Sequence, residues 1–302
     1  MRAISKSQTR PDLLNDPILP TLKTMTIPMI FGMITLMMFN IVDTFFISLL
    51  GTEPLAAVSF TFPVTFTVIS LAIGLGIGTS AVIAKALGSN KIDEARFDAS
   101  ISLMVGVVLV IVLSSVGYLL IDPIFTLLGA GAQVLPLIHE YMNVWFIGSV
   151  FLITPMIGNS VLRASGDTKT PSIVMGGAGL INAVLDPILI FGFGPVPALG
   201  IQGAAIASVV AWSVAVVIIL YILAVKKRLL SLKAGKQTVT GAIRKILKIG
   251  LPAAGANMLT PVAMAVMTAL VAHHGPEAVA AFGVGSRIES IASILVLALS
   301  MT

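Results

Sequence analysis

The chain has 302 residues, of which 57% are hydrophobic and only 10% are charged. No soluble domain buries that much apolar surface in its own core, so the composition excludes a soluble protein and indicates an integral membrane protein. The net charge of +5 is no signal for nucleic acid, because the cations lie between apolar segments, and the lack of cysteine excludes disulfides and thiolate metal sites.

Eight apolar segments follow one another along the chain, and each is long enough to cross a bilayer as a helix. We expect these spans at 22–49, 55–84, 97–121, 136–161, 171–193, 200–225, 246–272 and 278–302. Strands of a membrane barrel would alternate over about ten residues, which these segments do not do. The predicted fold is therefore an all-α integral membrane protein with eight transmembrane helices.

Every Lys and Arg except Arg287 lies before or at the start of the first span, or in or beside the breaks after spans 2, 4 and 6. Those breaks all lie on one side of the membrane. The positive-inside rule then predicts a multi-pass protein of the cell (inner or plasma) membrane with a cytoplasmic N-terminus.

The chain also repeats itself at a shift of 224 positions. This shift aligns Pro28 with Pro252, Gly51 with Gly275, and Glu53 with Glu277. Six spans separate the copies, so both run in the same direction, as in a parallel-repeat transporter. We expect a cytoplasmic segment at 1–21, a six-helix lobe at 22–225, a basic cytoplasmic linker at 226–245, and the first two helices of a second lobe at 246–302.

Two of the acids within the predicted spans lie at matched positions, and a charge at a helix centre costs roughly 2.5 to 3.5 kcal/mol. Asp43 lies eight residues before the turn at Gly51, and Asp186 lies eight residues before Gly194. The two carboxyl groups therefore share a depth in the outer half of the first lobe. Asn40 and Asn182 lie three and four residues before them, on the same helix faces.

Other polar groups are expected at the same depth. Tyr141 and Ser208 enter from the outer side, and Pro187 leaves the carbonyl of Ala183 without its helical partner. Such a layer of oxygens suits Na⁺, whereas two carboxyl groups close together in a low dielectric can share a proton. The sequence leaves the two ions open, and an intramembrane Ser or Tyr can also be a simple interhelical hydrogen bond.

Arg287 lies in the middle of the last span and needs an acid partner or water. Glu289 is two residues away and points elsewhere on the helix. Arg287 either lines a central cleft or forms an ion pair with a helix that is missing from this chain. No pairing of a nucleophile with a base and no metal-ligand spacing is present, so no enzyme, cofactor or metal site is predicted beyond the coupling ion.

Several stretches resemble the multidrug and toxic compound extrusion (MATE) transporters, in particular their DNA-damage-inducible F-like branch. They are VDTFFISLLGTEPLAAVSF at 42–60, GLGIGTSAVIAKALG at 74–88, LRASGDTKTP at 162–171 and NAVLDP at 182–187. The resemblance implies twelve helices in two lobes, of which this chain would hold eight. It also implies a monomeric antiporter that exports amphipathic, often cationic, organic compounds in exchange for H⁺ or Na⁺.

By resemblance the ion site falls on Asp43, Asn182, Asp186 and Tyr141, with Ser208 where many relatives have Thr. Pro28 matches a proline whose bend changes with protonation. The predicted span 246–272 lacks the acid that some relatives carry there, which puts coupling through the second lobe in doubt. Two alternatives remain: a lipid-precursor flippase of the same superfamily, and an inactive truncated membrane protein without transport.

Overall fold

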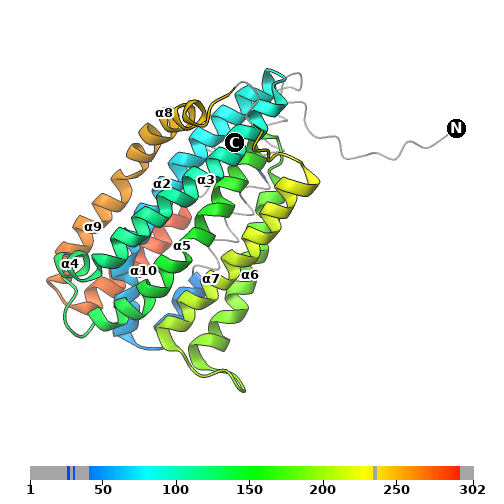
Figure 1. Cartoon of the computed structure of the whole chain (residues 1–302). Helices are drawn as coiled ribbons and strands as arrows, with labels where there is room; N and C mark the ends of the chain where they lie inside the picture. Colours follow the sequence, from blue (N-terminus) through cyan, green and yellow to red (C-terminus); the bar gives the residue numbers. More distant parts are fainter. Residues whose placement is uncertain (1–25, 28–29, 31–40, 234–236, 293–302) are drawn as a thin grey trace.

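The computed structural model describes residues 26–27, 30, 41–233 and 237–292, and shows a bundle of long helices (Figure 1). Pro28 and Asn40 lie outside the described residues. Residues 41–48 are helical and lead to the glycine turn at Gly51. The elements that follow are α2 (Thr52–Gly88), α3 (Ile92–Leu119), α4 (Ile121–Leu127), α5 (Leu135–Ala164), α6 (Lys169–Phe191), α7 (Gly200–Tyr221), the π-helix η1 (Ile222–Lys226), α8 (Val239–Asn257), α9 (Leu259–Ala272) and α10 (Pro276–Ala292).

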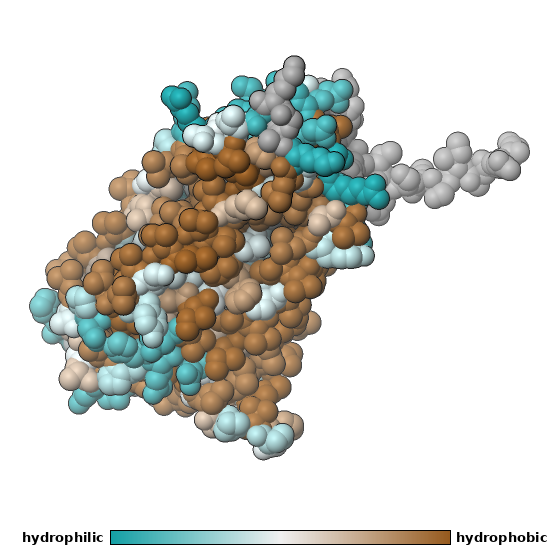
Figure 2. All heavy atoms as spheres, in the orientation of Figure 1, coloured by the Kyte–Doolittle hydropathy of each residue, from teal (hydrophilic) through white to brown (hydrophobic). Residues whose placement is uncertain are grey.

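Within these described residues, six helical stretches are long and apolar enough to cross a membrane. They are α2, α3, α5, α6, α7 with η1, and α8 together with α9. Figure 2 shows hydrophobic residues over the middle of the visible face and hydrophilic residues towards its ends. Large apolar side chains such as Ile147 (72% exposed) and Val217 (69% exposed) point outward, as expected where lipid replaces water. The predicted all-helical membrane fold is confirmed.

The two ends of the bundle differ in their loops. One end, here called the glycine end, is formed by residues 49–51, 128–134, 192–199 and 273–275. Its turns use glycines with positive φ, as at Gly51 (121°) and Gly275 (97°), a conformation that side chains with a Cβ rarely adopt. The other end, here called the lysine end, is formed by residues 89–91, 165–168 and 227–233.

Helix boundaries differ from the predicted spans where polar residues continue a helix beyond the apolar run. Helix α3 begins at Ile92 rather than at 97, because Asp93 and Glu94 favour the first helical turn. The stretch between the predicted spans 97–121 and 136–161 contains the short helix α4. The predicted span 246–272 is interrupted at Met258, because Pro261 has no N–H to donate to the carbonyl of Asn257.

Helix α2 is at the centre of the packing and contacts α3, α5, α8, α9 and α10. Helix α5 packs on α2, α3 and α7, and α7 packs on α6. The α6–α7 contact is close at Gly203, since a Cβ there would lie only 2.4 Å from the carbonyl oxygen of Leu189. This approach brings the polar residues of α6 and α7 next to each other.

Candidate functional site: a polar and aromatic cavity

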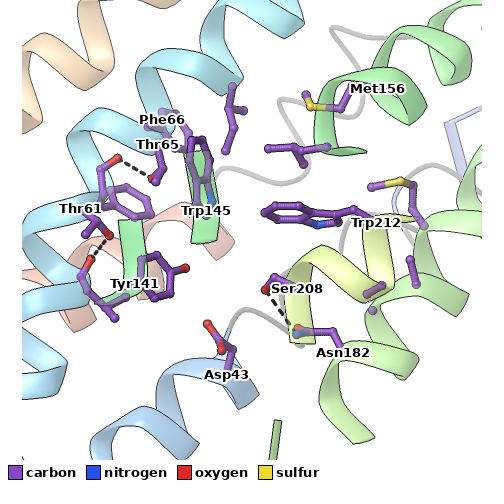
Figure 3. Close-up of a pocket in the computed structure, with 18 of the residues that line it drawn as sticks. Asp43, Thr61, Thr65, Phe66, Tyr141, Trp145, Met156, Asn182, Ser208 and Trp212 are labelled. Carbon is purple, nitrogen blue, oxygen red and sulfur yellow. Dashed lines mark hydrogen bonds between the residues drawn. The ribbon is translucent and has the colours of Figure 1, made fainter. Parts of the chain in front are cut away.

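A cavity of about 260 Å³ lies between residues 41–48 and helices α2, α5, α6, α7 and α10 (Figure 3). Polar and charged side chains from all six of these elements reach it. They are Asp43, Thr61, Thr65, Tyr141, Asn182, Ser208 and Arg287. Four of the predicted ion-site residues therefore line one cavity, although they come from sequence positions as far apart as 43 and 208.

Asp186 lies beside this cavity and is fully buried. Its Oδ1 accepts a hydrogen bond of 3.0 Å from the Asn182 side-chain amide, which also lies 3.4 Å from Ser208 Oγ. Asp186 Oδ2 has no hydrogen-bond partner among the described residues. The network joins α6 to α7 and leaves a carboxylate oxygen available.

Asp43 approaches the cavity from the helical residues 41–48, on the side where Tyr141, Asn182 and Ser208 also lie (Figure 3). Its Oδ1 is buried and lacks a hydrogen-bond partner in the described part of the chain. Asn182 lines the same cavity as Asp43 and donates a hydrogen bond to Asp186, so it lies at both acids' side of the bundle. The predicted clustering of the two acids therefore agrees with the geometry, while their role in ion binding stays a prediction.

Arg287 lines the same cavity from α10 and is only 8% exposed. Its guanidinium lies over the ring of Phe62, 5.8 Å from the ring centroid. Neither Nε nor Nη1 has a hydrogen-bond partner within the described residues. Glu289 is exposed on another face of α10. Among the described residues, Arg287 therefore lies in the lining of the cavity.

The aromatic wall of the cavity was not predicted. Trp145 and Trp212 meet edge to face with centroids 6.3 Å apart, and Phe62 stacks on Phe66 at 5.2 Å. Met156 and Met175 also line the cavity, which fits the adaptable packing of methionine. The spacing Thr61, Phe62, Thr65, Phe66, Ile69 marks one helix face, and this periodicity was a signal that sequence reasoning could have used.

Asp98 is a further feature that was not predicted from the sequence. It lies in the predicted span 97–121, is fully buried, and both of its carboxylate oxygens lack a hydrogen-bond partner among the described residues. It belongs to the lysine end of α3 and does not line the cavity. Asp98 is therefore a buried acid of a different kind from Asp43 and Asp186.

A helical membrane bundle with charged and aromatic residues around an internal cavity is typical of membrane transporters. The family model MatE matches residues 28–188, which is more than half of the chain. The chain therefore belongs to the MatE family, and its members are transporters rather than enzymes.

Individual relatives agree with this assignment. The chain is 45% identical over 292 residues to the FAD transporter of Shewanella oneidensis, which covers 96% of this chain and 65% of that protein. It is 27% identical over 289 residues to the multidrug export protein MepA of Staphylococcus aureus, covering 94% of this chain and 62% of MepA. The crystal structure of a mutant of the Vibrio cholerae MATE transporter VcmN superposes with a TM-score of 0.83 at 35% identity, covering 93% of this chain and 63% of that one.

Proposed function

We propose that this protein is a secondary active transporter that exports amphipathic organic compounds across the cell (inner or plasma) membrane in exchange for H⁺ or Na⁺. The chain spans less than two-thirds of the length of these relatives, so the activity of the whole protein is part of the proposal. One observation carries it: Asp43 lines the same aromatic cavity as Asn182 and Ser208, so an ion and a substrate would share one space.

The ion site consists of Asp43 and Asp186, with Asn182, Ser208 and Tyr141 as neutral oxygens around them. Na⁺ prefers several such oxygens, and a shared proton would relieve the repulsion between the two carboxylates. Asn40 and Pro28 remain proposals from the sequence for the ion site and for the bend of the first helix. Pro187 frees the Ala183 carbonyl next to Asp186.

Coupling requires that the ion binds one conformation more tightly than the other. One unit charge crossing a 100 mV membrane potential contributes about 2.3 kcal/mol. By the positive-inside rule the lysine end faces the cytoplasm, so the acids lie towards the outer side, where the ion enters.

The substrate proposal follows from the cavity wall. Trp145, Trp212, Phe62 and Phe66 offer ring edges and faces to a flat aromatic compound. Two relatives are named for FAD and for multidrug export, and both names are compatible with such a wall. We expect a monomeric protein, as the family resemblance of the sequence implies.

The experiment is efflux from proteoliposomes that contain the purified 302-residue chain, with an imposed gradient of H⁺ or of Na⁺. Ethidium and FAD serve as test substrates. We expect gradient-driven transport of at least one of them, and its loss in Asp43→Asn and in Asp186→Asn.

Glu140→Gln is the matched control, because Glu140 is an exposed acid next to Tyr141 on the same helix. It should transport like the wild type. Gradient-independent flux in the wild type, or full activity in both aspartate variants, would contradict the proposal.

A further inference from the structure

Arg287 combines burial, a net charge and free hydrogen-bond donors in one place. Only 8% of its surface is exposed, and its side chain lines the cavity. Its Nε and Nη1 have no hydrogen-bond partner, and it forms no ion pair within 4.0 Å in the described residues. Because an uncompensated buried charge is costly, such a group is set to receive an anion from outside the protein.

Two neighbours of Arg287 do not satisfy its donors. The Arg287 guanidinium lies over the ring of Phe62, and this contact takes up no N–H donor as a conventional hydrogen bond would. Asp43 lines the same cavity and its charge acts on Arg287, but the two groups form no contact ion pair. Nε and Nη1 therefore remain available to a ligand.

The rest of the cavity is suited to an aromatic ring. The perpendicular Trp145 and Trp212 form one part of the wall of this cavity of about 260 Å³ and offer an aromatic ring both an edge and a face. A guanidinium next to such a ring site matches compounds in which an aromatic group carries an oxyanion.

We propose that Arg287 is the specificity-determining residue of the cavity, and that the cavity selects aromatic compounds that bear a phosphate or carboxylate group. This inference rests on the proposed function of the same site and narrows its substrate class. The inferred substrates carry the opposite charge to the cationic drugs that the sequence resemblance implies, because a buried cation such as Arg287 repels a cationic substrate. The neighbouring Asp43 opposes the anion, so its neutral variant should bind the anion more tightly.

The chain offers a built-in reporter for the test. It contains two tryptophans, Trp145 and Trp212, and both line the cavity. Quenching of intrinsic fluorescence therefore reports on a ligand in this cavity. We would titrate the purified chain with three ligands that share one ring system: naphthyl phosphate, naphthol and naphthylmethylammonium, with free tryptophan as the inner-filter control.

The wild type should bind naphthyl phosphate about tenfold more tightly than naphthol, the size expected for a charge-assisted hydrogen bond. Arg287→Gln should lose this preference by weakening the binding of naphthyl phosphate far more than that of naphthol, and Arg287→Lys should keep part of it. Asp43→Asn should strengthen the binding of naphthyl phosphate and weaken that of naphthylmethylammonium. Arg244→Gln removes an exposed cation on α8 and should change nothing.

Equal affinities of the wild type for naphthyl phosphate and for naphthol would overturn the inference. So would an Arg287→Gln variant that keeps the preference, or one that loses affinity for all three ligands alike. Binding is measured at equilibrium without any ion gradient, so a failure of transport and a failure of charge selection are seen separately.

Discussion

The carboxylates of the lysine end and those of the cavity differ in their partners. At the lysine end Asp167 forms an ion pair with Lys227 and accepts hydrogen bonds from Thr170, and Glu94 pairs with Lys245 at 2.6 Å. In the cavity, neither Asp43 nor Asp186 forms an ion pair with any described cation. Asp167 and Glu94, each with a permanent lysine, are part of the structure, whereas Asp43 and Asp186 at the cavity are available to an exchangeable cation.

The largest expected effect concerns the cavity. Asp186→Asn should abolish gradient-driven efflux but should not lower the unfolding temperature, because it removes a buried charge that has no cation partner. Efflux and thermal unfolding of the same preparation measure both. If unfolding temperature and efflux fell together, Asp186 would be a structural acid like Asp167.

Asp167→Asn should show the opposite behaviour. The side chains of Asp167 and Lys227 are 13% and 17% exposed, so breaking their pair leaves a lysine largely buried without its partner. We expect a loss of about 2–3 kcal/mol in unfolding free energy. Asp93→Asn is the control, because Asp93 is 91% exposed, and it should change stability by less than about 0.5 kcal/mol.

The same ion pair predicts a pH dependence. Burial acts to raise the pKa of Asp167, but the hydrogen bonds from Lys227 and Thr170 outweigh it and hold the pKa below its usual value of 3.8. The stabilisation is therefore present above pH 3.8 and is lost as the pH falls through the lowered folded-state pKa. In acid unfolding, the wild type should lose this part of its unfolding free energy below the folded-state pKa of Asp167. Asp167→Asn should lack this stabilisation at every pH.

Asp98→Asn is a smaller test at the same end of the bundle. Because both oxygens of this buried acid lack hydrogen-bond partners in the described structure, a neutral amide should keep or raise stability, by about 1 kcal/mol. Chemical unfolding of the wild type and the variant measures the difference. A clear loss of stability would show that Asp98 depends on a cation such as Lys245.

The smallest effect is expected for Glu94→Gln. The Lys245 side chain is 46% exposed and that of Glu94 is 25% exposed, and solvent-exposed pairs are typically worth less than about 1 kcal/mol. The loss should shrink further at high salt, which distinguishes it from the more deeply buried Asp167 pair. A loss as large as that of Asp167→Asn would remove the distinction between buried and exposed pairs.

The sequence was sufficient for the helical membrane fold and for the grouping of Asp43, Asn182 and Asp186. A long apolar run satisfies its backbone hydrogen bonds in a bilayer by forming a helix. Asp43 and Asp186 lie equally far from the turns at Gly51 and Gly194, which places them at the same depth. The position of Arg287 in the same cavity was one of two open readings, because it depends on how α10 packs against α2.

Other features depend on tertiary packing and could not be predicted from the sequence. The aromatic wall combines Trp145 of α5 with Trp212 of α7, and no local pattern predicts that these two rings meet. The break at Met258 follows from Pro261, yet proline is often tolerated within a membrane helix, so its effect could not be read from the sequence. Asp98 was hidden because it lies near the end of a span, where acids are common.

Titration of tryptophan fluorescence with Na⁺ and with protons tests the central claim, one ion site shared by residues 43 and 186, most directly. The wild type should respond to at least one of the two ions, because Trp145 and Trp212 line the cavity that Asp43 enters. Asp43→Asn and Asp186→Asn should each abolish that response. An unchanged response in either variant would show that the two carboxylates do not hold the ion together.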